Sequence, residues 1–236
     1  MKNENEHKNC CGRIPAKGYA AMDAEGKIVP YDFERKPVGE HDILIGILYC
    51  GICHSDIHTA RSHWGKAHYP CVPGHEIIGR VVQVGGKVTK FKAGDYAGVG
   101  CMVNSCGVCP KCLAGEEQFC ENNKTVFTYD SADWEDEGRN APGGYASNIV
   151  VNEHFGINLP ADAPLDKIAP ILCAGITTYN PIKAAGVGKG TKVGIAGFGG
   201  LGHMALQYAV SLGAEVTVFD RTEEKRELAS RYGAHR

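Results

Sequence analysis

The sequence predicts a chain of mixed class, in which a β-rich barrel or sandwich is followed by an α/β unit with a parallel sheet. Three observations carry this prediction. Short runs of strand-forming residues, separated by turn residues, fill the chain from Lys17 to Val151. The pattern changes near Asp162, after which strands alternate with helical stretches. A glycine-rich run then follows the first strand of this second part.

In the first part, four runs rich in strand-forming residues are bounded by Gly, Pro or Asp, at residues 42–50, 76–84, 95–100 and 145–151. We assign this part to residues 13–165. Residues 122–142 form a polar stretch with a dense run of acids, and we expect a solvated loop there. Residues 1–12 are polar and charged, and we expect them to form a disordered leader.

In the second part, residues 162–185 are predicted to be helical, although Pro170 and Pro181 should break or kink the helix. A strand at 191–196, a helix at 201–212, a strand at 215–220 and a helix from Thr222 follow. This alternation implies parallel strands. Two strands do not make a complete doubly wound sheet, so we expect residues 166–236 to be the first part of such a domain.

Composition excludes several classes of protein. The 236 residues carry a formal net charge of −2, which gives no electrostatic case for nucleic acid or an anionic membrane surface. The leader has no apolar run that could serve as a signal peptide, and no stretch is long enough to span a membrane. The count of 11 cysteines is odd, which suits a reducing compartment. We therefore expect a cytoplasmic protein.

Four cysteines lie in the run CGVCPKCLAGEEQFC, within a lobe at residues 101–122, and they are Cys106, Cys109, Cys112 and Cys120. Two Cys-x2-Cys steps and one longer step can bring four thiolates around one point, which is what tetrahedral zinc requires. An all-thiolate site has no open position and is structural. The alternative, two disulfides in a secreted protein, conflicts with the missing signal peptide.

A glycine-rich turn, G-F-G-G-L-G, runs from Gly197 to Gly202, directly after a predicted strand and before a predicted helix. Such a turn lets a dinucleotide pyrophosphate approach the backbone at a helix N-terminus. Asp220 ends the next strand, where an acid can bind the ribose hydroxyls and repel a 2′-phosphate. This favours NAD, while Arg221 and Lys225 lie close enough to pair with the phosphate of NADP. The predicted cofactor-binding residues of this part are Gly197, Phe198, Gly199, Gly200, Leu201, Gly202, Asp220, Arg221 and Lys225.

Three further residues are candidate ligands of a second metal ion, namely Cys53, His75 and Cys173. Three protein ligands with one vacant position are the arrangement of catalytic zinc. Each residue taken alone is more often a packed or polar structural residue, and their spacing in the sequence does not establish that they meet.

The motifs together resemble those of the zinc-dependent medium-chain alcohol dehydrogenases. The pattern G-H-E-x2-G-x5-G-x2-V is formed by Gly74, His75, Glu76, Gly79, Gly85 and Val88, and the cysteine lobe and glycine turn follow it in the family's order. The segments GICHSDIH, WGKAHYPCVPGHEIIG and LCAGITTY most resemble the cinnamyl-alcohol-dehydrogenase-like branch. The resemblance covers the chain from about Lys17 to Arg236.

This resemblance implies a GroES-like catalytic domain followed by a Rossmann-type coenzyme domain. It implies that Cys53, His75 and Cys173 hold a catalytic zinc, with Glu76 as a near ligand. Asp56 would orient His75, and Ser55 would pass the proton of the alcohol towards His58. His54 would lie beside the pyrophosphate, and Thr177 near the nicotinamide.

The implied function is hydride transfer between NAD(P) and a primary alcohol or aldehyde, with an aromatic or allylic alcohol as the substrate class and two zinc ions per chain. The family continues beyond the point where this sequence stops, so we expect the 236 residues to be poorly active alone and to lack the interface of a homodimer or tetramer. The alternatives are a zinc-free reductase of the same superfamily, which the cysteines and His75 oppose, and a non-catalytic fragment that binds zinc and nucleotide.

Overall fold

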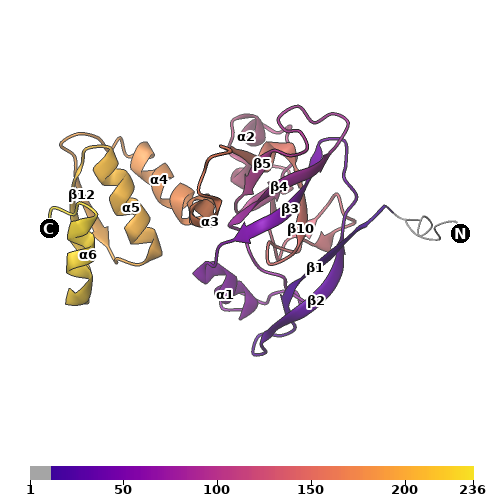
Figure 1. Ribbon diagram of the computed structural model, residues 1–236, viewed down its shortest axis with the longest axis horizontal. Helices are drawn as coiled ribbons and strands as arrows, with labels where there is room; N and C mark the ends of the chain where they lie inside the picture. The colour runs from indigo at the N-terminus through magenta and orange to yellow at the C-terminus, as the bar shows by residue number, and fades with distance from the viewer. Residues whose placement is uncertain (1–11) are drawn as a thin grey trace, which may run out of the picture. The chain divides into compact units, whose positions relative to one another are not determined.

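The computed structural model describes residues 12–236, which divide into two compact units, residues 12–169 and 170–236 (Figure 1). The predicted leader lies outside the described residues except for Gly12. We describe each unit by itself.

The first unit is built on a five-stranded antiparallel sheet with the strand order β10-β3-β4-β5-β11. The strands are β3 (Asp42–Cys50), β4 (Ile77–Val84), β5 (Tyr96–Val99), β10 (Asn148–Asn152) and β11 (Gly156–Leu159). Ile45 pairs with Ile149 on one side and with Val81 on the other, and all three are at most 2% exposed. Burial of these branched side chains from neighbouring strands forms the core of this unit.

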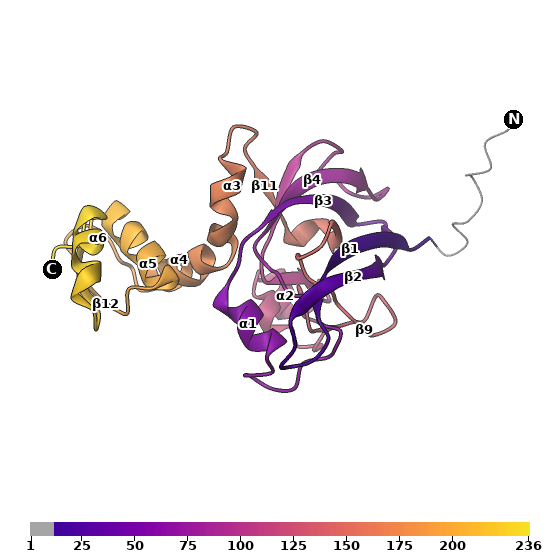
Figure 2. The same ribbon diagram turned by 60° about the horizontal axis from the view of Figure 1, so that its bottom comes forward.

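A two-stranded ribbon precedes this sheet, formed by β1 (Ile14–Ala21) and β2 (Ile28–Arg35), as Figure 2 shows. The sequence reasoning did not predict it. The turn of the ribbon is held by the Asp23 carboxylate, which accepts the backbone N–H of Glu25 at 2.8 Å. Single backbone bridges, Gly18 to Ala146 and Ala21 to Cys71, attach the ribbon to the rest of the unit.

The remaining elements of the first unit are short. Two small sheets pair β6 (Met102–Asn104) with β7 (Val126–Phe127) and β8 (Ala132–Asp133) with β9 (Arg139–Asn140). The α-helices are α1 (His54–Ala60), α2 (Pro110–Leu113) and α3 (Leu165–Ile168), and 3₁₀ turns lie at Glu117–Phe119 and Glu153–Phe155.

The acid-rich stretch at 122–142 is not the plain solvated loop that we expected. Asp136 accepts a 2.6 Å hydrogen bond from Arg13, Glu135 accepts one of 2.7 Å from Lys36, and Asp133 is only 8% exposed. These ion pairs bind the stretch to the start of the chain. Charge partners more than 95 residues away along the chain turn a polar run into a packed one.

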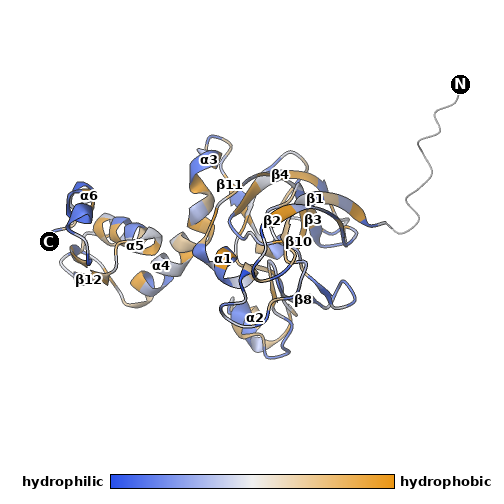
Figure 3. Ribbon diagram, turned by 90° about the horizontal axis from the view of Figure 1, so that it is seen from below, coloured by the Kyte–Doolittle hydropathy of each residue, from blue (hydrophilic) through white to orange (hydrophobic). Residues whose placement is uncertain are grey.

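The second unit has two parallel strands, β12 (Lys192–Ala196) and β13 (Glu215–Phe219), paired from Lys192 opposite Glu215 to Ala196 opposite Phe219. The helix α5 (Gly200–Ser211) connects them, as the alternating pattern predicted. Leu206 and Ala209 of this helix and Val216 of β13 are fully buried and centre the core. The helix α6 (Arg226–Arg231) is largely hydrophilic and buries only Ala229 (Figure 3).

The two prolines in the predicted helix at 162–185 act differently. Pro170 lies in a 3₁₀ turn, Ala169–Leu172, that separates α3 from α4 (Ala174–Ala184). Pro181 lies inside α4, which continues to Ala184, so of the two expected effects it does not have the first, a break of the helix. None of the helices within residues 12–236 has the length and apolar character needed to cross a membrane.

Replacing Ile45 by Ala should lower the free energy of unfolding of the first unit by about 2–5 kcal/mol, because it leaves a cavity among fully buried strands. Urea unfolding followed by tryptophan fluorescence measures this, since Trp64 and Trp134 both belong to that unit. The matched control is Ile157→Ala in β11, whose side chain is 46% exposed and should change stability by less than about 0.5 kcal/mol. Equal effects would contradict the assigned core.

Candidate metal and cofactor sites

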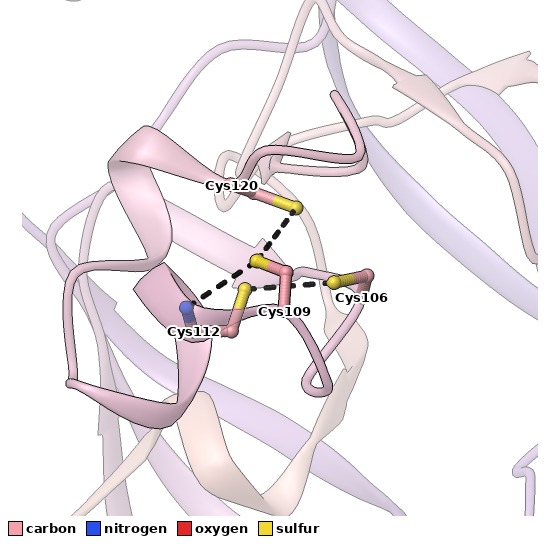
Figure 4. Close-up of side chains that lie close together, drawn as sticks. All are labelled: Cys106, Cys109, Cys112 and Cys120. Carbon is pink, nitrogen blue, oxygen red and sulfur yellow. Dashed lines mark hydrogen bonds between the residues drawn. The ribbon is translucent and has the colours of Figure 1, made fainter.

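The four cysteines of the lobe meet around one point (Figure 4). The Sγ atoms of Cys106 and Cys112 are 3.7 Å apart, and those of Cys109 and Cys120 are 4.0 Å apart. Zinc–sulfur bonds of about 2.3 Å in a tetrahedron require sulfur–sulfur distances of about 3.8 Å. All four sulfurs lie within 4.8 Å of one another. The site therefore fits a tetrahedral zinc ion held by sulfur alone.

Local backbone structure shapes this site. Cys109 caps the short helix α2, and its sulfur accepts the backbone N–H of Cys112 at 3.5 Å. Pro110 at the first helical position suits this start because its fixed φ is already helical. The backbone N–H of Val108, directed at the sulfur of Cys106, is the main reason that the pKa of this thiol is lowered to about 6. N–H groups directed at sulfur stabilise thiolates, which are the form that binds zinc.

A second group of donors lies in the first unit, where the ligand atoms of Cys53, His75 and Glu76 are within 4.8 Å of one another. Cys53 caps the start of α1, while His75 and Glu76 directly precede β4. Gly51 makes this approach possible, because a Cβ at this residue would collide with the Glu76 carboxylate. Sequence spacing alone did not establish this meeting.

The carboxylate of Asp56 organises these donors, and it is only 2% exposed. Its Oδ1 accepts hydrogen bonds from His75 Nδ1 at 2.9 Å and from the Gly74 N–H at 3.0 Å. Its Oδ2 accepts the Cys53 N–H at 2.9 Å and the Tyr145 hydroxyl at 2.7 Å. Burial by itself would raise the pKa of Asp56, but these bonds, led by that from His75, lower it. Because Nδ1 is bound to Asp56, Nε2 is the ring nitrogen with which His75 would bind a metal ion.

Glu76 supplies the test of whether a cation fits here. Its side chain is 3% exposed, and Oε2 has no hydrogen-bond partner among the described residues. Burial raises the pKa of this carboxyl group above its ordinary value. A buried, unpaired carboxylate oxygen is costly unless a cation compensates it. Glu76 beside a cysteine and a histidine therefore fits a bound zinc ion.

The predicted proton-relay residues lie on α1. Ser55 and His58 are half-buried and His54 is exposed, with the rings of His54 and His58 stacked at 5.1 Å. His58 Nδ1 lies 3.0 Å from the Nδ1 of His63.

The sequence reasoning did not predict the partner His63. The only signal for it was a histidine just beyond the helix end, where Ser62, with a φ of 56°, turns the chain back.

Trp64 stacks on the His58 ring at 4.8 Å and is 67% exposed, so it is not part of the core of this unit.

In the second unit, Cys173 caps the start of α4 and is 9% exposed, and its carbonyl oxygen accepts the backbone N–H of Thr177 at 2.9 Å. Thr177 lies in the first turns of the helix with its side chain exposed. Their predicted roles as a zinc ligand and a nicotinamide contact stay predictions.

The glycine turn has the three properties that a pyrophosphate loop requires. Gly197 has a φ of 89°, which side chains rarely adopt. A Cβ at Gly199 or Gly200 would meet open space, so a ligand can approach the backbone where α5 begins. A Cβ at Gly202 would collide with the Gly197 carbonyl, so this glycine permits the close contact of helix and strand. Within the same turn, Phe198 is buried and Leu201 exposed.

Asp220 is bound to this turn. Its Oδ2 accepts the Phe198 N–H at 2.7 Å and the Lys225 ammonium group at 3.0 Å. Its Oδ1 accepts the backbone N–H of Thr222 at 3.1 Å and its hydroxyl at 2.9 Å. The Phe198 N–H contributes most to lowering the pKa of Asp220. Lys225 is thus paired with Asp220, while Arg221 is exposed.

Thr222 is a contact that sequence reasoning missed, although threonine two residues after aspartate is a typical turn signal.

Comparison with known proteins places these sites in a family. Residues 39–161 match the alcohol dehydrogenase GroES-like domain, and residues 200–236 match the zinc-binding dehydrogenase domain. Vomilenine reductase of Rauvolfia serpentina is 48% identical over 233 residues, which are 98% of this chain and 62% of that protein. Cinnamyl alcohol dehydrogenase 2 of the same plant is 48% identical over 217 residues, which are 92% of this chain and 59% of that protein.

Solved structures agree with this placement. A cinnamyl alcohol dehydrogenase (CAD) of Sorghum bicolor superposes with a TM-score of 0.89 at 44% identity, covering 93% of this chain and 62% of its own. A CAD of Helicobacter pylori, complexed with NADP(H), gives 0.91 at 54% identity, covering 94% and 63%. The predicted fold class is confirmed. The chain spans about 60% of the length of these relatives.

Replacing Cys109 by Ser should remove one metal ion per chain and expose the lobe at 101–122 to proteolysis, because a three-sulfur site loses both charge and coordination. Metal analysis and limited trypsin digestion measure the two effects. Cys101→Ser is the matched control, since Cys101 lies at the start of the lobe but outside the four-sulfur group. Loss of the same ion from the Cys101 variant would contradict the assigned ligands.

Proposed function

Because the chain belongs to the zinc-dependent medium-chain alcohol dehydrogenase family, in its cinnamyl-alcohol-dehydrogenase-like branch, we propose that it transfers a hydride between NAD and a primary alcohol or the corresponding aldehyde. The substrate class that we propose is an aromatic or allylic alcohol. The observation that carries the proposal is the donor group around Cys53, His75 and Glu76, held by a saturated Asp56.

Each residue of this site receives one role. On the family resemblance, Cys53, His75 and Cys173 would bind the ion, and Glu76 would be a near ligand that can exchange with water or substrate. The bound zinc lowers the pKa of an alcohol and polarises an aldehyde carbonyl. Asp56 holds His75 in orientation and tautomer.

Ser55 hydrogen-bonds the substrate oxygen and passes its proton towards His58, near the surface. His54 contacts the pyrophosphate and Thr177 lies near the nicotinamide.

The four cysteines hold a second, structural zinc, so that we propose two ions per chain. The lobe offers four sulfurs at tetrahedral spacing, whereas the first group offers nitrogen, oxygen and sulfur donors. Four sulfurs close the coordination of the lobe site, whereas the mixed donors of the first group suit a site that can accept a substrate oxygen.

NAD is the proposed cofactor, with NADP as the alternative. The carboxylate of Asp220 follows β13 and lies at the glycine turn, where it would repel a 2′-phosphate. Lys225, which could have bound such a phosphate, is instead paired with Asp220. For the whole protein we propose a homodimer or tetramer, on the family resemblance alone.

The test of the function is an absorbance assay for NADH formation with a panel of primary, aromatic and allylic alcohols, combined with metal analysis. Cys53→Ala should abolish hydride transfer and remove one zinc while the structural zinc stays. Cys50→Ala is the matched control because Cys50 lies outside both donor groups. A Cys53 variant that retains both ions would refute the site, and two ions without any hydride transfer would favour the zinc- and nucleotide-binding alternative.

Asp220→Asn should raise the affinity for NADPH relative to NADH by about tenfold, because it removes the charge that repels the 2′-phosphate and weakens a charged hydrogen bond. Fluorescence titration with both reduced cofactors measures the ratio. Glu224→Gln provides the control. Glu224 is an exposed acid in the same unit, and its substitution removes the same charge. An unchanged ratio in the Asp220 variant would contradict the proposed preference.

A further inference from the structure

The sequence indicated no function for the segment Pro-Gly-Gly-Tyr at 142–145. In the structure, this segment is hydrogen-bonded to the turn before β4, which contains His75. Gly143 donates its N–H to the Val72 carbonyl at 2.7 Å, Gly144 to Gly74 at 2.8 Å and Tyr145 to Pro73 at 2.9 Å. These bonds place Tyr145 beside the residue that directly precedes His75.

Glycines let the two segments approach this closely. Gly74 has a φ of 104°, and a Cβ there would lie 2.7 Å from the Tyr145 nitrogen and 2.8 Å from its ring carbon Cδ1. A Cβ at Gly144 would collide with the side chain of Ile77. The tyrosine ring therefore packs against backbone that only glycine leaves accessible.

The hydroxyl of Tyr145 ends on Asp56, 89 residues away in the sequence, at 2.7 Å from Oδ2. The other oxygen of this carboxylate accepts His75 Nδ1. Tyr145 thus holds from one side the carboxylate that holds His75 from the other. Burial, and then the hydrogen bond to Asp56, raise the pKa of Tyr145, so its phenol remains a hydrogen-bond donor at neutral pH.

We propose that Tyr145 is a positioning residue of the catalytic zinc site: its hydroxyl fixes Asp56, and thereby the orientation of His75, without contacting the ion or the substrate. This proposal rests on the proposed function. Outer partners of metal-bound histidines typically change metal affinity by about 10- to 100-fold when they are removed. The Tyr145 hydroxyl is one hydrogen bond further out, because it binds Asp56, which in turn binds His75.

The test is Tyr145→Phe in the full chain, which keeps the ring and removes only the hydroxyl. Competition with a chromophoric chelator measures the zinc affinities of both sites in one titration. The affinity of the Cys53–His75 site should fall by about tenfold, the lower end of that range, because the hydroxyl acts through Asp56. The four-cysteine site should be unchanged and serves as the internal reference for folding.

Tyr69→Phe is the matched control. Its hydroxyl also donates a partly buried hydrogen bond, to the Ala60 carbonyl at 2.9 Å, but this bond lies at the opposite end of α1 from Cys53. It should change neither affinity. Cobalt(II) in place of zinc adds a spectroscopic readout, since its visible bands should shift in the Tyr145 variant and not in the Tyr69 variant.

A double-mutant cycle separates positioning from plain structural support. If Tyr145 acts through Asp56, the double variant Asp56→Asn with Tyr145→Phe should bind zinc no more weakly than Asp56→Asn alone. Additive losses, or equal weakening of both zinc sites in Tyr145→Phe, would overturn the proposal. If the wild-type chain binds two ions and Tyr145→Phe binds zinc at the Cys53–His75 site as tightly as the wild type, the proposal is also overturned. A wild-type chain that binds one ion would instead overturn the proposed function itself, and this inference with it.

Discussion

The buried carboxylate of Asp56 accepts four hydrogen bonds from three separate segments of the first unit. Cys53 provides one from the start of α1, Gly74 and His75 provide two from the turn before β4, and Tyr145 provides one from the segment before β10. A charge of this kind is tolerated in the interior only when its acceptors are filled. The same bonds therefore balance the burial of Asp56 and set the positions of two candidate metal ligands, Cys53 and His75.

The two donor groups differ in what they leave unsatisfied. In the lobe, sulfurs, backbone N–H groups and the amide of Asn122 surround the centre, and four sulfurs suffice for zinc. Beside His75, the buried Oε2 of Glu76 has no partner among the described residues. A structural site gains from being closed, whereas a site that must bind and release a substrate oxygen needs a ligand that can give way. Glu76 has the chemistry and position of such a ligand.

Sequence reasoning was strongest where the signal is local. The spacing of Cys106 to Cys120 and of Gly197 to Gly202 determines which atoms can meet, so the group of four sulfurs and the glycine turn could both be predicted without a structure. It failed where the partner lies far along the chain. The ribbon β1–β2 has no strong local turn motif beyond Asp23, and the acids at 133–136 are packed by Arg13 and Lys36. Tyr145 contacts Asp56 across 89 residues, a distance that no local pattern encodes.

Asp220 repeats in the second unit the logic of Asp56 in the first. Both carboxylates accept backbone N–H groups from the turns that they organise, and both have all their strong acceptor directions in use. Asp56 can keep all its hydrogen bonds, because its role is to hold its partners in place.

For Asp220, a ribose hydroxyl can bind the carboxylate only by joining or displacing an existing donor. The Phe198 N–H belongs to the glycine turn itself, so the exposed donors, Lys225 and the Thr222 hydroxyl, are the ones that can move. In the proposed cofactor site, we therefore expect the affinity for the adenosine ribose to depend on how readily these two side chains release Asp220, as well as on the charge of the carboxylate.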